Sequence, residues 1–394
     1  MSKRSRKRRW LAGPATSVER IQAECAAARR MLLCMTDHHI GNFVISTPVI
    51  RAFQRQMGTR LDILIPKRHA DLARQLIDPG RVVRHTMPGS TLRDVAGFIS
   101  TLGKVFGRYD VLLSLDSNIR AATLAASAGA RTTIGVDNAR RSRLYRQRLP
   151  NDSAGHAFRN YTQFLRCLGD SSPVFEYFEV QPEDQLRLDP LLKGAAIDTN
   201  TPYAVVHPGA GKGHRRWPTE RFASVADGIV EDFGFRICMI AGRDDREIAL
   251  DVIHHMRHGN QAACLVGPLG TLLPLLSRSK LLICNESGPM HLAAFTRCPI
   301  VAMFGPTRHE NWAPLREGPD VAVLQGDRCP TMCGRGQCHA ENACLTSISV
   351  DSVRDAARCV VACSESSQAE LHVPEVGGAG SMHRCVDRST SMII

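Results

Sequence analysis

A chain of 394 residues is too long for one compact core, so we expect two domains plus extensions. Its 43% hydrophobic and 22% charged residues are ordinary for a soluble globular protein, and no apolar run approaches the roughly 18 residues that would suggest a membrane-spanning helix. The net charge of +12 is partly local, because six of the first nine residues are Lys or Arg.

The basic start, MSKRSRKRRW, leaves two interpretations open. One is that residues 1–28 form a disordered arm attracted to polyanions such as nucleic acid, anionic lipid or a phosphorylated glycan. The other is a start with no such role, either a solvated segment or a misassigned start codon. The following LAGPATSVERIQAE is broken by Pro, Glu and Arg, so it is not the apolar core of a signal peptide. We therefore predict a cytoplasmic protein, at most peripheral to a membrane.

Short apolar runs alternate with amphipathic stretches through the first half, which indicates parallel strands with crossover helices over residues 29–185. The expected strands lie at residues 31–35, 61–65 and 111–115 and near Thr133. The polar turn TDHHIGN follows the first of them, at a strand's carboxyl end, and a helix follows the turn. The acidic, Pro-containing residues 178–202 are predicted to connect two domains.

The second half, residues 200–362, repeats the pattern more clearly, and each strand stops at Gly or a polar residue. The expected strands and their turns lie at residues 203–209, 235–242, 263–267, 280–287 and 299–307. Open α/β sheets bind ligands at this edge, so two such domains facing each other predict a cleft between their carboxyl edges. Residues 363–394 lack periodicity, and we predict a disordered tail.

Two of these turns have the chemistry of a phosphate and sugar site. The turn HPGAGKGHRR combines glycines, which let backbone amides approach an anion, with cations. The turn NESGPMH places a carboxylate and a hydroxyl at the start of a helix, where Pro fits the first turn. The candidate ligands are His207, Gly209, Gly211, Lys212, Arg215, Glu286, Ser287, Gly288, His291 and Thr307. A basic surface loop, a His291 packed on the sheet and an ordinary Gly-Pro turn before Thr307 are the structural alternatives.

Most of the fourteen Cys residues stand singly in apolar runs and are interpreted as small buried hydrophobes. Cys329, Cys333, Cys338 and Cys344 form a cluster beside His339. Its spacings are looser than those of paired C-x2-C knuckles, so a structural zinc and reduced or partly oxidised loop cysteines both remain open. No catalytic cofactor or catalytic metal is expected.

Taken together, these stretches resemble glycosyltransferase family 9, the heptosyltransferase-type enzymes of the lipopolysaccharide inner core. The matching motifs run in order through residues 30–362: IGN-STP at 40–48, YDVLLSLD at 109–116, IGVDNARR at 134–141, HPGAG with RRWPTERFA at 207–223, MIAGRDD at 239–245, the run 266–294, FGPT at 304–307 and the Cys cluster. The resemblance implies an α/β GT-B fold, two Rossmann-like domains facing across a cleft. It also implies inverting transfer from a nucleotide-activated heptose, usually ADP-heptose, without a catalytic metal.

The resemblance carries over residue by residue. The family's phosphate-binding Lys before Trp-Pro corresponds to Arg215, which keeps the charge. The family's Asp-Thr-Gly-x-x-His corresponds to Glu286, Ser287, Gly288 and His291, so a carboxylate and a hydroxyl are kept.

The turn at Gly41 departs from the family pattern, because the residue after Ile-Gly is Asn42 instead of the presumed Asp base. A positioned base contributes about 100- to 10,000-fold, and an amide cannot take the proton at neutral pH. Either Asp37, His38 or His39 replaces the base, or activity is weak or absent.

We therefore predict an inverting glycosyltransferase that moves heptose from ADP-heptose to a lipopolysaccharide-core acceptor, which the Ile40–Ser46 loop receives at the inner membrane surface. The alternative is a catalytically impaired protein that binds a sugar nucleotide. Nucleic-acid binding is disfavoured, because aromatic residues make up 5% of the chain and no stacking or helix-turn-helix motif is present.

Overall fold

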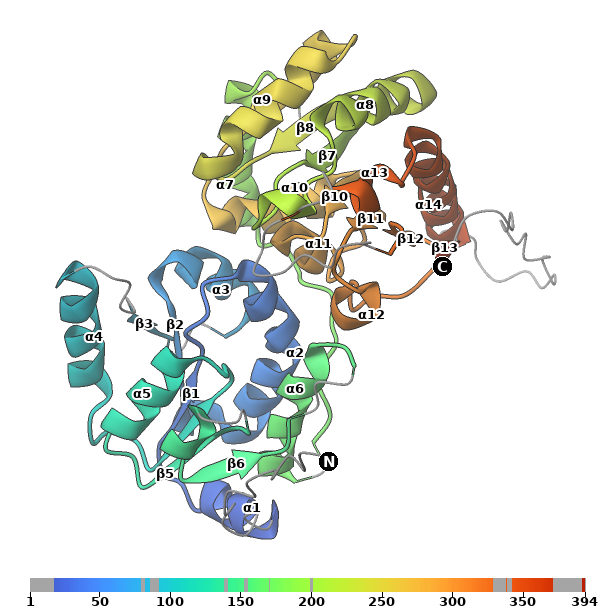
Figure 1. The fold of residues 1–394 in the computed structure, drawn as a ribbon. Helices are drawn as coiled ribbons and strands as arrows, with labels where there is room; N and C mark the ends of the chain where they lie inside the picture. Colours follow the sequence, from blue (N-terminus) through green and yellow to red (C-terminus); the bar gives the residue numbers. More distant parts are fainter. Residues whose placement is uncertain are drawn as a thin grey trace, which may run out of the picture.

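The computed structural model describes most of the chain as two α/β halves, one above the other in Figure 1. The described residues are 18–78, 82–85, 92–137, 141–151, 155–169, 171–198, 201–328, 338, 342–370 and 392–393. Among them, we find no helix whose length and hydropathy would let it cross a membrane.

The N-terminal half is built on a parallel sheet with the strand order β3-β2-β1-β4-β5-β6. Its strands are β1 (Met31–Cys34), β2 (Leu61–Pro66), β3 (Val82–His85), β4 (Val111–Ser114), β5 (Thr132–Val136) and β6 (Gln147–Leu149). Its helices are α1 (Val18–Ala26), α2 (Ile40–Met57), α3 (Ala70–Leu76), α4 (Leu92–Val105), α5 (Ile119–Ser127) and α6 (Phe158–Thr162). Every residue of β1, β2, β4 and β5 is buried, as expected for parallel strands with helices on both faces.

The C-terminal half has the strand order β13-β12-β11-β10-β7-β8-β9. Its strands are β7 (Tyr203–His207), β8 (Arg236–Ile240), β9 (Ala262–Leu265), β10 (Leu281–Asn285), β11 (Ile300–Phe304), β12 (Val321–Gln325) and the antiparallel β13 (Met392–Ile393). Its helices are α7 (Pro182–Gly194), α8 (Thr219–Phe233), α9 (Arg246–His255), α10 (Leu272–Arg278), α11 (Gly288–Ala293), α12 (His309–Trp312), α13 (Ala343–Thr346) and α14 (Val350–Glu370).

Apart from β13, the two sheets have the same strand order. The first strand of each half pairs with the second and the fourth, so β1 lies between β2 and β4, and β7 lies between β8 and β10. After its first strand, each half continues to one side of the sheet, and after its fourth strand it continues to the other side. The two connections diverge, which opens a crevice at the carboxyl ends of these two strands. The predicted pair of Rossmann-like domains is confirmed.

Two predictions of disorder are wrong where helices form, and the predicted connection is helical in part. The predicted arm over 1–28 contains α1, whose Ile21 and Cys25 are buried one turn apart; residues 1–17 lie outside the described part. The predicted connection over 178–202 contains α7, which begins with a Pro at its first turn and buries Leu188 and Leu192. Helix α14 continues into the predicted tail as far as Glu370.

The predicted acceptor loop Ile40–Ser46 is also helical, because α2 begins at Ile40. This first turn packs against the first turn of α11, which lies between the two halves in Figure 1. A Cβ at Gly41 would lie 2.7 Å from the Cδ2 of His291, and a Cβ at Gly288 would overlap the Cγ2 of Ile40. The two halves therefore approach through glycines at the starts of two helices.

Replacing Gly288 with Ala should destabilise the protein by about 1–3 kcal/mol, because the new methyl group must displace Ile40 or push the two halves apart. Urea unfolding measures the change. The matched control is Gly103→Ala on α4, where a Cβ meets nothing within 4 Å and should be neutral or stabilising. Equal stability of the two variants would contradict the close contact.

Candidate active site

A cavity of about 740 Å³ lies between the two halves, where the carboxyl ends of β1 and β10 face each other. The predicted site residues that line it are Asp37, His38, His39, Gly41, Asn42, His207, Gly211, Lys212, Arg215, Glu286, Ser287, Gly288 and His291. Gly209 and Thr307 were also predicted but are not among the lining residues. Gly209 lies directly behind the lining, because a Cβ there would be 3.1 Å from the Nε2 of His207.

The turn after β1 is held by a carboxylate from the neighbouring strand. The Oδ2 of buried Asp116 accepts hydrogen bonds from the backbone N–H of Thr36, from its hydroxyl at 2.8 Å, and from the N–H of Asp37 at 2.9 Å. Burial raises the pKa of Asp116 to about 6, although the donors from Thr36 oppose this. Sequence reasoning missed this role of Asp116.

Two buried histidines brace the same turn from its other side. His69 donates from Nε2 to the carbonyl of His38 at 3.2 Å, and His85 donates from Nε2 to the carbonyl of Met35 at 2.9 Å. Burial lowers the pKa of each ring to about 4, so both are neutral at pH 7. The backbone of residues 35–38 is thus held between strands β2, β3 and β4.

The side chains of this turn form a small hydrogen-bonded cluster. The Oδ1 of Asp37 accepts from the Nδ1 of His39 at 2.6 Å and from its backbone N–H at 2.9 Å. The Oδ2 of Asp37 accepts from the Nδ2 of Asn42 at 2.5 Å. Burial raises the pKa of Asp37, but these donors outweigh it and hold the pKa well below its usual range.

His38 stacks on His39, with ring centroids 4.5 Å apart. Among the described residues, the metal-ligating atoms of Asp37, His38 and His39 all lie within 4.8 Å of one another. The Oδ1 of Asp37 and the Nδ1 of His39 are already bonded to each other, so the arrangement fits a hydrogen-bonded cluster better than a metal centre.

The glycine-rich turn after β7 forms the opposite wall. Buried Asn285 holds it, accepting from the N–H of Trp217 at 3.1 Å and donating to the carbonyl of Pro208 at 2.8 Å. Arg216 also supports the turn, donating to the carbonyl of Ala210 at 3.2 Å and to Asp245 at 2.9 Å. Exposed Lys212 and half-buried Arg215 remain as the cations of this wall, and exposed Arg68 lines the cavity from the N-terminal half.

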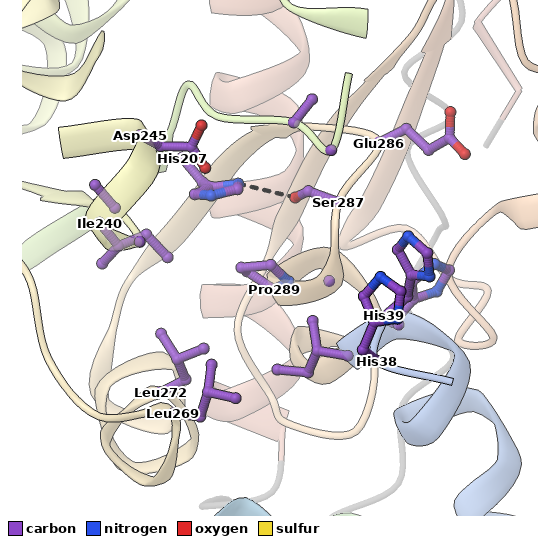
Figure 2. Close-up of a pocket in the computed structure, with 18 of the residues that line it drawn as sticks. His38, His39, His207, Ile240, Asp245, Leu269, Leu272, Glu286, Ser287 and Pro289 are labelled. Carbon is purple, nitrogen blue, oxygen red and sulfur yellow. Dashed lines mark hydrogen bonds between the residues drawn. The ribbon is translucent and has the colours of Figure 1, made fainter. Parts of the chain in front are cut away.

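Polar side chains follow β10 on the same wall. Arg215 contacts the Oε1 of Glu286 at 3.2 Å, and the Glu286 side chain is 9% exposed. Burial raises the pKa of Glu286, whereas Thr307 and Arg215 lower it. The hydroxyl of Ser287 is 3.0 Å from the Nδ1 of His207, the hydrogen bond drawn in Figure 2.

The sequence left open whether His291 faces the binding site or packs as a structural residue, and in the structure it does both. It lines the cavity, and its ring also packs against Gly41 at the start of α2. Burial, and then the charge of His156, lowers the pKa of His291 to about 3, so the ring is neutral. Figure 2 shows His38 and His39 across the cavity from His207 and Ser287.

The Cys cluster is described only in part. Cys329, Cys333 and His339 lie outside the described residues. Cys344 is buried, and the Sγ of Cys338 accepts from the N–H of Asn342 at 3.2 Å. The structural zinc therefore stays a prediction.

Comparison with known proteins identifies one family repeatedly. The model of glycosyltransferase family 9 (heptosyltransferase) matches residues 99–343. Lipopolysaccharide heptosyltransferase 3 of Escherichia coli is 23% identical over 288 residues, which cover 70% of this chain and 83% of the relative.

Two solved structures share the fold. Escherichia coli ADP-heptose LPS heptosyltransferase II has a TM-score of 0.69 at 17% identity, over 85% of this chain and 99% of that chain. Escherichia coli heptosyltransferase WaaC with ADP-2-deoxy-2-fluoro heptose has a TM-score of 0.59 at 18% identity, over 83% of this chain and 98% of that chain. The predicted GT-B architecture is thereby confirmed.

Replacing Asp116 with Ala should lower the free energy of unfolding by about 3 kcal/mol, because buried donors of Thr36 and Asp37 lose their acceptor. Asp116→Asn keeps an acceptor oxygen and should cost less. The control Asp355→Ala removes an exposed ion pair with Arg358 and should cost less than about 1 kcal/mol. Urea unfolding compares the three variants, and equal losses for Asp116→Ala and the control would contradict the anchor.

The pH dependence gives a second readout of the same contact. The pKa of Asp116 rises from 3.8 to about 6 on folding, so the folded state holds this proton more tightly. The contribution of Asp116 to stability therefore falls as pH rises from about 4 to 6, and this component should be missing from Asp116→Asn.

Proposed function

The chain belongs to glycosyltransferase family 9, and on this premise we propose that it transfers heptose from ADP-heptose to a lipopolysaccharide-core acceptor. The proposed transfer inverts the configuration at the anomeric carbon. One observation carries the proposal: a single cavity between the halves has a cationic glycine turn on one wall and an acidic and histidine-containing turn on the other. The names of the relatives, lipopolysaccharide heptosyltransferase 3 and ADP-heptose LPS heptosyltransferase II, support the substrates.

The C-terminal wall suits the donor. Backbone amides of the turn at Gly209 and Gly211, with Lys212 and Arg215, would bind the diphosphate and stabilise the negative charge that develops as it leaves. These cations supply the charge that a metal ion would otherwise provide, so we propose transfer without a catalytic metal.

Other residues of this wall would position the sugar and ribose. Glu286 offers a carboxylate for their hydroxyls, and it also orients Arg215 through the 3.2 Å contact. Ser287 adds a hydroxyl, and Thr307 supports Glu286 from outside the lining. Gly288 and His291 shape the floor of the site where the halves meet.

The N-terminal wall would receive the acceptor hydroxyl at the turn of Asp37, His38 and His39 and the first turn of α2. The impaired alternative rests on Asn42. However, the Asn42 amide donates a hydrogen bond to the ionised carboxylate of Asp37, and the same carboxylate accepts one from the imidazole of His39. This favours an active enzyme over a protein that only binds the donor.

We also propose that the protein is cytoplasmic and peripheral on the inner membrane. Helix α4, at the outer edge of the N-terminal half in Figure 1, exposes Val95 and Ile99 one turn apart, and Phe106 follows on the same face. Lys104 and Arg108 are exposed beside them, which is the composition of a surface that binds anionic lipid.

Purified protein should release ADP when given ADP-heptose and a lipopolysaccharide-core acceptor in the presence of EDTA. Arg215→Ala should lower kcat/KM by about 10- to 100-fold, because it removes a charged contact to the diphosphate. The control Arg187→Ala removes an exposed Arg of α7 and should leave the rate unchanged. Donor binding by calorimetry without ADP release would support the impaired alternative and contradict transfer.

Vesicle flotation tests the membrane contact. The double variant Ile99→Asp, Phe106→Asp should bind vesicles containing phosphatidylglycerol at least about tenfold more weakly, because two apolar side chains no longer enter the lipid. Leu186→Asp is the control, since this Leu is 71% exposed on α7 of the other half. Equal binding by both variants would exclude α4 as the contact.

A further inference from the structure

An inverting transfer needs a proton acceptor on the N-terminal wall, and the family position for it holds Asn42. The attacking hydroxyl loses its proton as it bonds to the anomeric carbon, and an amide cannot accept it at neutral pH. The surrounding hydrogen bonds indicate which neighbour takes this role.

The directions of these hydrogen bonds assign the tautomer of His39. Carboxylate oxygens only accept, so the Nδ1 of His39 donates to Asp37 across 2.6 Å. The lone pair of the neutral ring then lies on Nε2. The His39 side chain is 66% exposed on the cavity, so an acceptor hydroxyl can reach this nitrogen.

Asp37 is poorly suited to take the proton itself. Both of its oxygens are occupied, one by His39 and the other by Asn42 at 2.5 Å. These donors stabilise the charged carboxylate, and a carboxylate stabilised in this way is a weak base. Its geometry is that of a group that orients an imidazole.

His38 is distinguished from His39 by the charges around it. Burial and then the charge of His39 lower the pKa of His38; Asp37 raises it, and Arg68 and Arg120 lower it by less. The hydrogen bond to Asp37 raises the pKa of His39, against burial and the charges of Arg68 and Arg215. Of the two rings, His39 is the stronger base.

We propose that His39 is the general base of the transfer and that Asp37, held in turn by Asn42 and Asp116, positions it. This inference rests on the proposed function of the same cavity. Asn42 replaces the family's carboxylate in sequence, but here its amide keeps the orienting carboxylate in place, and the base is the imidazole three residues earlier.

The proposed step is balanced. A lone pair of the acceptor hydroxyl forms the new glycosidic C–O bond, while the bond from the anomeric carbon to the phosphate oxygen breaks and its electron pair leaves with ADP. The hydroxyl proton moves to the Nε2 of His39, giving an imidazolium that Asp37 stabilises. The exposed ring then releases the proton to solvent.

The test follows ADP release across pH, with EDTA, for wild type, His39→Ala, Asp37→Asn and Asn42→Asp. His39→Ala should lower kcat by about 100-fold or more, leave donor affinity unchanged, and recover activity with added imidazole, because the site is open. The wild-type rate should rise with pH through an imidazole pKa above 6.5, since the base must be neutral to act. Asp37→Asn should be slower and move this limb to lower pH.

Asn42→Asp separates the proposal from the lost-base alternative. It places a second carboxylate against the Oδ2 of Asp37, so the two acids must share a proton. The hydrogen bond from His39 to Asp37 then becomes weaker. Activity should fall. A gain of activity in Asn42→Asp would show that Asn42 marks a missing base and would contradict His39.

His255→Ala is the matched control, because this exposed His of α9 also lies beside an Asp, with its Nδ1 3.6 Å from the Oδ1 of Asp251. It should keep the wild-type rate and pH profile. The assignment of the base would be overturned if His39→Ala kept the wild-type kcat and pH profile, or if His38→Ala lost as much activity as His39→Ala. Either result would leave the proposed function of the cavity standing. Wild type that releases no ADP would overturn the proposed function as well.

Discussion

The contact between the first turns of α2 and α11 determines where every other group of the site lies. Gly41 meets the ring of His291, and Gly288 meets Ile40, at distances that leave no room for a Cβ. Each of these helices begins just after a central strand of its sheet, β1 or β10. Because both sheets share one strand order, this contact brings the two crevices at their carboxyl ends face to face. The cavity follows from that arrangement.

Buried polar groups hold the backbone of each wall through hydrogen bonds. Asp116 holds the turn after β1, and Asn285 holds the glycine turn after β7. Both residues lie at the carboxyl end of the fourth strand of their half and reach the turn that follows the first strand. A buried polar group is costly unless its hydrogen bonds are made, and here those bonds position the residues that face the cavity. Arg216 likewise supports the glycine turn, which leaves Lys212 and Arg215 for an anion.

The two walls also offer different functional groups, although the cation Arg68 lines the N-terminal wall as well. The C-terminal wall presents cations and backbone amides, which suit a leaving diphosphate. The N-terminal wall presents a carboxylate bonded to an imidazole, which suits the removal of a proton. The contact of Arg215 with Glu286 lies on the C-terminal wall, while Asn42 joins the cluster of Asp37 and His39 on the N-terminal wall. Asn42 is therefore one part of a hydrogen-bond network with Asp37 and His39.

The sequence alone determined the central strands, the turns that follow them, the family and many of the polar residues that line the cavity, because buried parallel strands and glycine turns leave a local pattern. It missed the strands β3, β6, β12 and β13, which lie toward the edges of the two sheets. The local pattern did not reveal the helices α1 and α7, because few of their side chains are buried. Only the tertiary structure decided that Asp116 would bind a turn 79 and 80 residues away, that Gly41 would meet His291, and that His39 rather than His38 would face Asp37. These contacts depend on how the two sheets and two helices pack against each other. Contacts between residues far apart in the chain leave no periodic pattern in the sequence, so one sequence alone does not reveal them.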